Sequence, residues 1–352
     1  MKGIILHGGA GTRLRPITHT GPKQLIPIGN KPMSQYALEY IIESGIKDIG
    51  IILGDINPEK VIEYYGNGEK FNCNITYINQ GQPLGIAHAV SLTEPFVNKD
   101  KFVVVLGDNL IGDSIKQYVD KFDKGNYDAY VVLSKSSHPQ DFGVAELSKK
   151  GELLRLIEKP KNPPSKYVIT GIYFFSSIVF EHIKKLKPSW RNEYEITEAI
   201  QSIIDSGGKV GYDIIDSWWK DTGTVEDILS ANRLILDKII NNEETRNIQG
   251  KIKIGRNVKI SEDSIVRGPV VIGDNCIIED NVFIGPYTSI GDNCVLKKVS
   301  IENSIIIKNS HIDTEKMIID SIIGEGSVIS NANGMKPSGL RMVIGENSKL
   351  YV

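Results

Sequence analysis

Length, composition and charge narrow the class of protein before any motif is considered. The chain has 352 residues, 40% hydrophobic and 24% charged, which is typical of a folded protein large enough for two domains. A net charge of −2 without a long run of basic residues argues against a nucleic-acid-binding surface. No apolar stretch approaches the roughly 20 residues that span a bilayer, so we expect a cytoplasmic protein without membrane contact.

The first short strand, expected over residues 3–6, runs into the glycine-rich stretch GGAGTRLRPITHTGPK at residues 8–23. Its glycines allow the backbone to approach a ligand closely, and bare N–H groups in a tight turn bind anions. Because Arg13 and Lys23 add full positive charge, the stretch predicts a polyphosphate site. It is not a P-loop, since no Gly-Lys-Ser/Thr occurs, and it is a weak dinucleotide fingerprint, since Leu14 stands at the third glycine position.

Beyond this loop, β-rich runs alternate with helical patterns up to about residue 215. Apolar residues recur at helical spacing from Met33 to Ile41, and Gly45 follows as the expected stop. The alternation predicts an α/β fold with a doubly wound, mostly parallel sheet, whose ligands bind beyond the carboxyl ends of the strands. Asp108 ends one of these strands, so we expect it to converge with the glycine loop. Further strands are expected over residues 48–53, 75–78, 102–106, 128–133 and 168–175.

The C-terminal part has a different periodicity. A helix expected over residues 225–240 leads into a polar linker, and aliphatic residues then recur at a strict spacing of six. A hexapeptide repeat predicts a parallel β-helix in which each aliphatic points into a prism. The register slips after the last of these positions and resumes at Ile306, Ile312 and Ile318. The eight aliphatics are Ile254, Ile260, Val266, Ile272, Ile278, Ile284, Ile290 and Leu296.

These patterns predict a catalytic domain over residues 1–240, a linker over 241–250 and a β-helix domain over 251–352. The three cysteines lack C-x-x-C spacing, which argues against a zinc site or a secreted disulfide framework. Cys276 and Cys294 are three hexads apart, so we expect them to stack inside successive coils as buried, unreactive thiols.

The glycine-rich stretch is the first of several blocks that together resemble one known family. The run LHGGAGTRLRPITHTGPKQLIPIGNKP resembles the N-terminal motif of the sugar-phosphate nucleotidylyltransferases, and its Lys23-Gln24-Leu25 variant resembles the glucose-1-phosphate thymidylyltransferases. The resemblance extends through the block WWKDTGT and continues into a tail similar to the left-handed β-helix of the family's long forms. His7 departs from the pattern, because a small residue usually occupies that position. The other blocks are QGQPLGIAHAV (80–90), LGDN (106–109), FGVAEL (142–147), EKP (158–160), TGIYFF (170–175), RNEYEIT (191–197) and WWKDTGT (218–224).

The resemblance implies transfer of a nucleotidyl group from dTTP to glucose-1-phosphate, which gives dTDP-glucose, a precursor for dTDP-rhamnose biosynthesis, and pyrophosphate. Both reactants are polyanions, so the site must neutralise and align charge without a covalent intermediate. Thymine and uracil differ by one methyl group, so UTP stays open as a substrate. The expected cofactor is Mg²⁺, and the expected partners are these small molecules and further copies of the chain in a homo-oligomer.

The resemblance also implies a role for each site residue. Asp108 and Asp221 match the magnesium ligands, and carboxylate oxygens suit that ion. Arg13 would clamp the β- and γ-phosphates and Lys23 the α-phosphate. The implied catalytic set is Arg13, Lys23, Asp108, Lys159 and Asp221. The implied nucleotide-binding set is Gly8, Gly9, Gly11, Thr12, Arg13, Gln24, Gln80, Pro83 and Gly85. The implied sugar-phosphate-binding set is Asn109, Gly143, Glu158, Lys159, Ile169 and Arg191. Glu193 and Glu195 are either ligands or the charged start of a helix.

Two other functions remain open at this point. Similar β-helix tails occur in bifunctional enzymes that also acetylate an amino sugar, although this tail has a single histidine, His311, and no long inserted loop. Some relatives are inactive regulatory subunits that sense sugar nucleotides. The presence of all five residues of the implied catalytic set argues against that second function.

Overall fold

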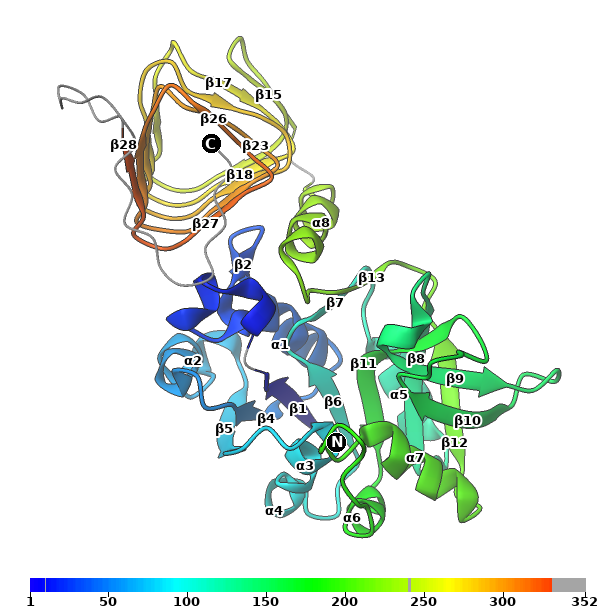
Figure 1. The fold of residues 1–352 in the computed structure, drawn as a ribbon. Coiled ribbons are helices and arrows are strands. Elements are labelled where there is room, and N and C mark those ends of the chain that lie inside the picture. The colour runs from blue at the N-terminus through cyan, green and yellow to red at the C-terminus, as the bar shows by residue number, and fades with distance from the viewer. Residues whose placement is uncertain (10, 240–241, 331–352) are drawn as a thin grey trace. The chain divides into compact units, whose positions relative to one another are not determined.

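Strands and helices alternate from residue 2 to residue 221 and build one mixed sheet. The computed structural model describes residues 1–9, 11–239 and 242–330. Within these residues, nine strands form the sheet in the order β10-β9-β11-β6-β1-β4-β5, with β8 beside β11 and β12 beside β8 (Figure 1). The strands are β1 (Lys2–His7), β4 (Asp48–Leu53), β5 (Asn74–Asn79), β6 (Phe102–Leu106), β8 (Ala129–Lys135), β9 (Gly143–Leu147), β10 (Leu153–Glu158), β11 (Tyr167–Phe175) and β12 (Val210–Ile214). The α/β fold expected from the sequence is confirmed.

The sheet has a parallel half and an antiparallel half. Strands β6, β1, β4 and β5 run parallel to their neighbours in this order. Strand β11 runs antiparallel to β6, β8 and β9, and β9 and β10 form a hairpin. The strand pattern of the sequence did not reveal this reversal, because periodicity marks a strand without giving its direction.

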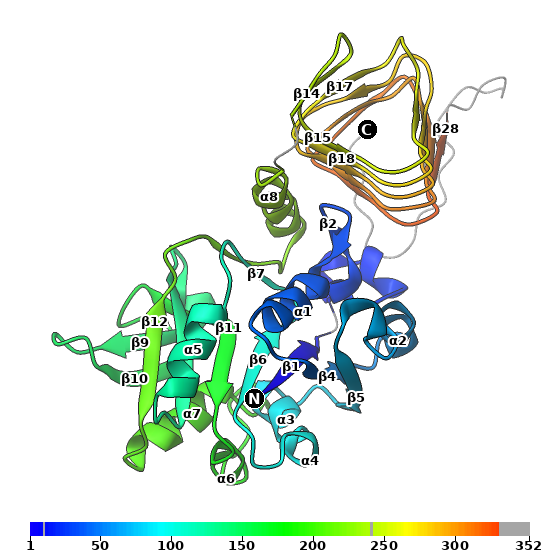
Figure 2. The same ribbon diagram turned by 180° about the vertical axis from the view of Figure 1, so that it is seen from behind.

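Helices cover both faces of the sheet, as Figures 1 and 2 show from opposite sides. Successive strand residues alternate between two buried clusters: Ile4 packs with α3, α6 and α7, whereas Ile5 packs with α1, α2 and α5. This alternation is the expected consequence of the two-residue period of a strand. The helices are α1 (Met33–Glu43), α2 (Pro58–Tyr65), α3 (Ile86–Ser91), α4 (Glu94–Val97), α5 (Lys116–Lys124), α6 (Val179–Ile183) and α7 (Ile196–Asp205).

Short elements complete this part of the chain. Strands β7 (Asn109–Ile111) and β13 (Trp219–Asp221) form a small antiparallel pair. The 3₁₀ helices η3 (Lys23–Leu25), η4 (Glu69–Phe71) and η5 (Pro139–Asp141) lie in connections between the larger elements.

The chain divides into two compact units, and the second contains more than the C-terminal region. The first unit comprises residues 1–10, 20–25 and 33–221, and the second comprises residues 11–19, 26–32 and 222–352. The second unit therefore includes η1 (Thr12–Leu14), η2 (Ile17–His19), the hairpin of β2 (Pro27–Ile28) and β3 (Lys31–Pro32), and α8 (Val225–Leu236).

The buried side chain of Asn232 connects three parts of the second unit. It lies on α8, which begins with a capping box at Thr224 and ends at Leu236, short of the expected position 240. Its oxygen accepts hydrogen bonds from the Gly29 amide (2.9 Å) and the Ser289 hydroxyl (2.8 Å), and its amide donates to the Tyr287 carbonyl (3.1 Å). The sequence predicts that α8 and the β2–β3 hairpin belong to the catalytic domain, whereas the structure groups both with the β-helix. The boundaries 1–240, 241–250 and 251–352 stay a prediction.

Three parallel sheets form the walls of the β-helix, and aliphatic side chains fill its interior. Val266, Ile272, Ile278, Ile284, Ile290 and Leu296 are all buried, as the six-residue period predicts. The strands are β14 (Asn242–Glu244), β15 (Ile248–Ile254), β16 (Lys259–Ile260), β17 (Ile265–Arg267), β18 (Val270–Ile272), β19 (Ile277–Ile278), β20 (Phe283–Ile284), β21 (Thr288–Ile290), β22 (Val295–Lys297), β23 (Ser300–Glu302), β24 (Ile305–Ile306), β25 (His311–Asp313), β26 (Met317–Ile319), β27 (Ile322–Ile323) and β28 (Val328–Ser330). Residues 331–352 of the predicted β-helix domain lie outside the described residues.

Two departures from the strict period have simple structural causes. Ile254 is 37% exposed because it lies on the first coil, where it pairs with Ile272 of β18 on one side. The register slip after Leu296 reflects shorter coils: Ile272 pairs with Ile290, whereas Ile290 pairs with Ile306, which is a shorter step along the chain. Ile306 and Ile312 are buried on the far side of this change.

An asparagine ladder follows one corner of the β-helix. Asn257, Asn275, Asn293 and Asn309 each have a positive φ between 57° and 63°, a backbone region that asparagine adopts more readily than most residues. Their side-chain amides donate in sequence to the next asparagine oxygen at 3.1, 3.2 and 3.0 Å. The corner is therefore fixed by both backbone preference and stacked amides.

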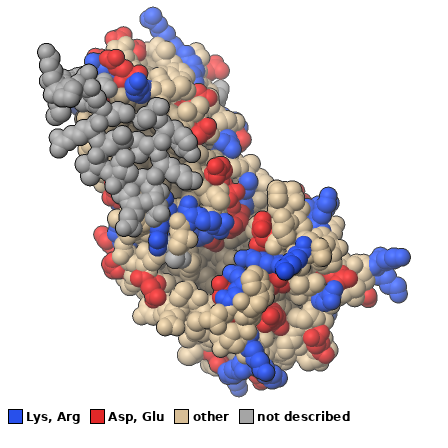
Figure 3. Space-filling model, viewed as in Figure 1, with Lys and Arg blue, Asp and Glu red and all other residues tan. Residues whose placement is uncertain are grey.

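The surface carries both signs of charge. On the face that Figure 3 shows, basic and acidic side chains are interspersed. Within residues 1–9, 11–239 and 242–330, every helix is too short or too polar to cross a bilayer.

Candidate active site

Two glutamines hold the glycine-rich turn that follows β1. The side chain of Gln24 is almost fully buried, and its amide donates to the Gly8 carbonyl oxygen at 2.7 Å. On the other side, a Cβ placed on Gly8 would lie 3.2 Å from the side-chain oxygen of Gln80. Gly9 has a φ of +97°, which side chains rarely adopt. Gly8 and Gly9 therefore give a bare, fixed turn at the carboxyl end of β1.

The next residues of the predicted phosphate loop belong to the second unit. Gly11 has a φ of 57° and precedes η1, and its carbonyl oxygen accepts a hydrogen bond from the Thr18 hydroxyl at 2.8 Å. The side chains of Thr12 and Arg13 on this short helix are exposed. An exposed guanidinium is available to a phosphate ligand.

The segment after β5 forms a second glycine turn. Gln80 donates from its side-chain amide to the Gly85 carbonyl oxygen at 3.3 Å, and Pro83 between them is exposed. Gly85 begins α3 with a φ of +103°, and a Cβ there would lie 2.6 Å from the carbonyl oxygen of Tyr194. Only glycine fits at this position. The turn brings together three of the predicted nucleotide-binding residues.

Asp108 follows β6 and forms a partly buried ion pair with Lys23. The side-chain amide of Asn109 donates to the Asp108 carboxylate at 3.0 Å. Burial by itself would raise the pKa of Asp108, but the attraction of the Lys23 ammonium and these hydrogen bonds outweigh it and lower the pKa below its ordinary value. Asp108 is therefore a carboxylate at neutral pH.

The register of β7 and β13 determines where Asp221 lies. It is directly opposite Asn109 in the antiparallel ladder, where Cα atoms are typically about 4.5–5.5 Å apart. The indole N–H of Trp219 donates to the Asn109 side-chain oxygen (2.8 Å) and to the Thr170 carbonyl (2.9 Å), which fixes β13 against β7 and β11. Parts of the chain that are distant in sequence thus pair Lys23 with Asp108 and place Asp221 opposite the residue that follows Asp108.

The donor set around Asp108 and Asp221 suits Mg²⁺. This ion is usually held by one or two carboxylates, with water and substrate phosphates as its other ligands. Among the described residues, no group of three or more His, Cys, Asp or Glu side chains has an arrangement that would hold a metal. One or two carboxylates near a bare glycine turn fit an ion that arrives with a triphosphate.

A second cluster of charged residues surrounds Glu158 at the end of β10. A guanidinium nitrogen of Arg191 lies 3.6 Å from a carboxylate oxygen of Glu158 and 3.4 Å from one of Glu195. The Thr197 hydroxyl donates a hydrogen bond to the Glu158 carboxylate at 3.2 Å. Burial and the nearby Glu195 carboxylate raise the pKa of Glu158, although Lys159, Thr197 and Arg191 act in the opposite direction. The cluster offers a carboxylate and a guanidinium to a ligand that carries both hydroxyl groups and a phosphate.

Three more residues of the predicted sugar-phosphate set, Gly143, Lys159 and Ile169, lie around this cluster, whereas Asn109 lies on β7 opposite Asp221. A Cβ on Gly143 would lie 2.7 Å from Thr197 and 3.2 Å from Ile169, so these three residues are in contact. Lys159 has a φ of 40°, and its amide donates to the Phe142 carbonyl at 3.0 Å. Gly143, Glu158, Ile169 and Arg191 are therefore neighbours in the first unit.

Several residues at the site were missed or left open by the sequence analysis. Glu195 directly precedes α7, which confirms the charged start of a helix, and it is a buried partner of Arg191. A role for Glu195 as a ligand stays a prediction. Thr197 and Trp219 were not singled out, although both lie in motifs quoted above. Their hydrogen bonds to Glu158 and Asn109 are tertiary contacts without a periodic signal.

Comparison with known proteins agrees with this geometry. The family model described as nucleotidyl transferase matches residues 2–238, and one described as GMPPB C-terminal domain matches residues 266–350. The chain is 45% identical to the low-salt glycan biosynthesis nucleotidyltransferase Agl11 of Haloferax volcanii, over 99% of both chains. It is 38% identical to a glucose-1-phosphate thymidylyltransferase of Streptomyces griseus, over 100% of this chain and 99% of the other.

The chain is also similar to a solved structure of a related protein. A putative glucose-1-phosphate thymidylyltransferase from Bacillus anthracis, in complex with a sucrose, is 40% identical with a TM-score of 0.64. The match covers 69% of this chain and 98% of that one. The chain therefore belongs to the nucleotidyl transferase family, and it is a sugar-1-phosphate nucleotidyltransferase.

Proposed function

We propose that this enzyme transfers the thymidylyl group of dTTP to glucose-1-phosphate, with Mg²⁺ as cofactor, and gives dTDP-glucose and pyrophosphate. The observation that carries the proposal is the partly buried Lys23–Asp108 ion pair with Asp221 opposite Asn109. Such an arrangement binds and aligns polyanions.

Each charged residue has a definite task in this proposal. Asp108 and Asp221 would hold Mg²⁺, which when bound neutralises charge on the triphosphate and on the departing pyrophosphate. Lys23 orients the α-phosphate, and Arg13 binds the β- and γ-phosphates through its fork of N–H groups. The sugar phosphate attacks the α-phosphorus in line, so an added covalent step is unnecessary.

The sugar-binding side is assigned to the Glu158 cluster. Glu158 accepts hydrogen bonds from sugar hydroxyls, while Lys159 and Arg191 bind the attacking phosphate. Gly143, Ile169 and Asn109 shape the pocket around the sugar. Support comes from the packing of Gly143 against Thr197 and Ile169 and from the ion pair of Arg191 with Glu158.

The choice of dTTP and glucose-1-phosphate rests on relatives. Two relatives from Streptomyces with this activity in their names match the chain over its full length at 38% and 40% identity. The more similar Haloferax relative is named for glycan biosynthesis, so another sugar phosphate is the main competing substrate. A methyl group separates thymine from uracil and supports a discrimination of about 1–3 kcal/mol, so we expect measurable use of UTP.

The test is a matrix of pyrophosphate release with the full-length chain. Five triphosphates (dTTP, UTP, ATP, GTP and CTP) are each paired with glucose-1-phosphate, mannose-1-phosphate, galactose-1-phosphate and N-acetylglucosamine-1-phosphate, with Mg²⁺ or with EDTA. We expect the highest kcat/KM for dTTP with glucose-1-phosphate and loss of activity in EDTA. A higher kcat/KM for another pair would replace the proposed substrates, and Mg²⁺-independent turnover would exclude the proposed metal role.

We further propose that the chain forms a homo-oligomer through the β-helix unit, because solenoid ends leave strand edges and apolar surface exposed. Light scattering of the full-length chain tests this, and a monomer at micromolar concentration would contradict it.

Adding acetyl-CoA and glucosamine-1-phosphate to the same samples tests the bifunctional alternative, for which His311 is the sole candidate histidine among the described residues of the β-helix.

A further inference from the structure

A cavity of about 90 Å³ lies at the carboxyl ends of the parallel strands β1, β4 and β5. Its volume is several times the roughly 10–15 Å³ that one water molecule needs. Gly9, Gln80 and Pro83 of the proposed nucleotide-binding set line one part of it. The rest of the lining comes from His7, from Pro22 and Gly81, and from residues 54–61, in the β4–α2 loop and at the start of α2. His7 has no role in the proposed function so far.

His7 is a buried polar residue whose ring nitrogens are unsatisfied. Its side chain is 2% exposed, and neither Nδ1 nor Nε2 has a hydrogen-bond partner among the described residues. Leaving a buried donor or acceptor without a partner costs about 1–3 kcal/mol. An aliphatic side chain would fill the same space without this cost, so the imidazole is better explained by a ligand than by packing.

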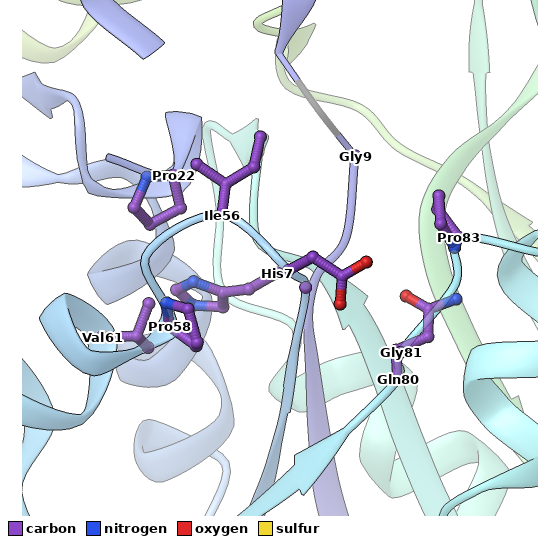
Figure 4. Close-up of a pocket in the computed structure, with 11 residues that line it drawn as sticks. His7, Gly9, Pro22, Ile56, Pro58, Val61, Gln80, Gly81 and Pro83 are labelled. Carbon is purple, nitrogen blue, oxygen red and sulfur yellow. The ribbon is translucent and has the colours of Figure 1, made fainter. Parts of the chain in front are cut away.

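Figure 4 shows the ring of His7 on the side of the cavity lined by Pro58 and Val61, with Gln80 and Pro83 across from it. An edge contact with Tyr65, at 6.0 Å between ring centroids, helps to fix the ring. Burial lowers the pKa of His7 to about 3, so the ring is neutral at physiological pH. A neutral imidazole offers one N–H donor and one nitrogen acceptor.

The chemistry of the lining points to the uncharged part of a nucleotide. Among the eleven described residues around the cavity, none is Lys or Arg, and one is the carboxylate Asp55, which would repel a phosphate. Pro22, Ile56 and Val61 add apolar surface. Apolar walls with a few neutral donors and acceptors suit a base or a pentose ring.

We propose that His7 is a nucleotide-selectivity residue, which forms a hydrogen bond with the nucleoside part of the triphosphate in this cavity. The inference rests on the proposed function, because it assumes that the triphosphate binds at the carboxyl end of β1. It adds His7 to the residues of the predicted nucleotide-binding set. A side chain of β1 therefore contributes to selectivity for the base or the pentose of the nucleotide.

Two substitutions separate hydrogen bonding from packing. His7→Leu keeps an apolar side chain of similar bulk but removes the donor and acceptor, whereas His7→Gln keeps both kinds of group. His88→Leu is the matched control, because His88 lies on α3, is half-buried and also has an unpartnered Nδ1 among the described residues, yet it does not line the cavity. Thermal unfolding of all three variants establishes that each is folded.

Nucleotide analogues then identify the group that His7 contacts. Relative to dTTP, dUTP lacks the 5-methyl group, 5-methyl-UTP adds the 2′-hydroxyl, dideoxy-TTP lacks the 3′-hydroxyl, and 5-methyl-dCTP changes the pairing edge of the base. We expect His7→Leu to lower kcat/KM for dTTP by about 3- to 10-fold and to change the penalty for one of these analogues by a similar factor. His7→Gln should restore much of that selectivity, and KM for glucose-1-phosphate should stay unchanged in all variants. An equal loss for every analogue, or a loss that His88→Leu shares, would overturn the inference.

A binding measurement keeps this inference distinct from the proposed function. The ring ¹⁵N signals of His7, assigned by their loss in His7→Leu among six histidines, are recorded with dTTP or with tripolyphosphate. We expect a shift with dTTP and none with tripolyphosphate, and the reverse would refute a nucleoside contact. If the wild-type chain releases no pyrophosphate with any substrate pair, the proposed function fails. If it is active but the His7 variants keep the wild-type selectivity, only the inference fails.

Discussion

The α/β sheet and the β-helix are stabilised by contacts of different range. In the α/β region, Lys23 pairs with Asp108 and Asp221 lies opposite Asn109, although these partners lie far apart in the sequence, and each of these contacts occurs once. In the β-helix, each coil pairs with the next one along the chain, and the same contacts repeat from coil to coil. The non-repeating region can place unlike charged groups around a ligand, whereas the repeating region stacks like groups.

The comparison predicts that substitutions in the sheet affect chemistry most. Asp108→Asn and Asp221→Asn should each lower kcat by about 10²- to 10³-fold or more, because each removes a carboxylate that we assign to Mg²⁺. Steady-state pyrophosphate release over a range of Mg²⁺ concentrations measures this. Asp120→Asn, an exposed residue of α5, is the control and should behave as the wild type. A near-normal rate in either site variant would remove that residue from the metal site.

Core substitutions should distinguish the middle of the β-helix from its end. Ile284→Ala should lower the free energy of unfolding by about 2–5 kcal/mol, because Ile284 is fully buried between two coils. Ile254→Ala should lower the free energy of unfolding by roughly half of that amount or less, because Ile254 is partly exposed on the first coil. Denaturant unfolding with hydrogen exchange across residues 270–312 compares the two. Equal losses would contradict the assignment of Ile254 to an open end.

The asparagine ladder predicts a smaller effect with an internal control. Asn293→Ala loses two ladder hydrogen bonds and places a Cβ at a φ of 58°, which together should cost about 1–2 kcal/mol. Asn293→Gly loses the same side-chain amide, but glycine adopts the positive φ of this position without strain. It should therefore lower the free energy of unfolding by less than Asn293→Ala does. Both variants should keep the wild-type kcat, measured beside their melting curves. If the glycine variant is the less stable one, backbone preference does not determine this corner.

Within the sheet, two carboxylates predict opposite pH dependences. The folded-state pKa of Asp108 lies below its ordinary value of 3.8, so the Lys23–Asp108 pair contributes stability above about pH 4 and loses it as the pH falls. The folded-state pKa of Glu158 lies above its ordinary value of 4.5, so ionised Glu158 costs stability as the pH rises through that range.

Melting temperatures from pH 3.5 to 8 test this contrast. The destabilisation caused by Asp108→Asn should be larger at pH 7 than at pH 3.5, whereas Glu158→Gln should become relatively more stable than the wild type as the pH rises. The same sign of change for both variants would show that one of these two environments is assigned wrongly.

The smallest effect is expected at the stacked cysteines. Cys276 and Cys294 are both buried and unbridged, which confirms the expected burial, and each thiol lies near a backbone carbonyl of the following coil. A thiol reagent should therefore label neither residue in the native protein and both after denaturation. Mass spectrometry of labelled peptides measures this. Fast native labelling would mean that the coils open on the timescale of the reaction.

The sequence determined the local elements and the repeat. Predicted strands over residues 48–53 and 102–106 coincide with β4 and β6, and the six-residue period places the buried aliphatics of the β-helix. These features follow from periodic burial of side chains, which a single chain records directly. The family blocks also indicated the class of reaction, because they contain the residues that a polyphosphate site requires.

Only the tertiary structure decided which residues meet. Strand direction put Asp221 opposite Asn109, the fold placed Gln24 beneath Gly8, and α8 joined the β-helix unit through Asn232. The unsatisfied ring of His7 likewise appears only once its surroundings are known. Contacts between residues far apart in the chain leave no periodic pattern, since they depend on how the elements pack and not on the spacing of residues within them.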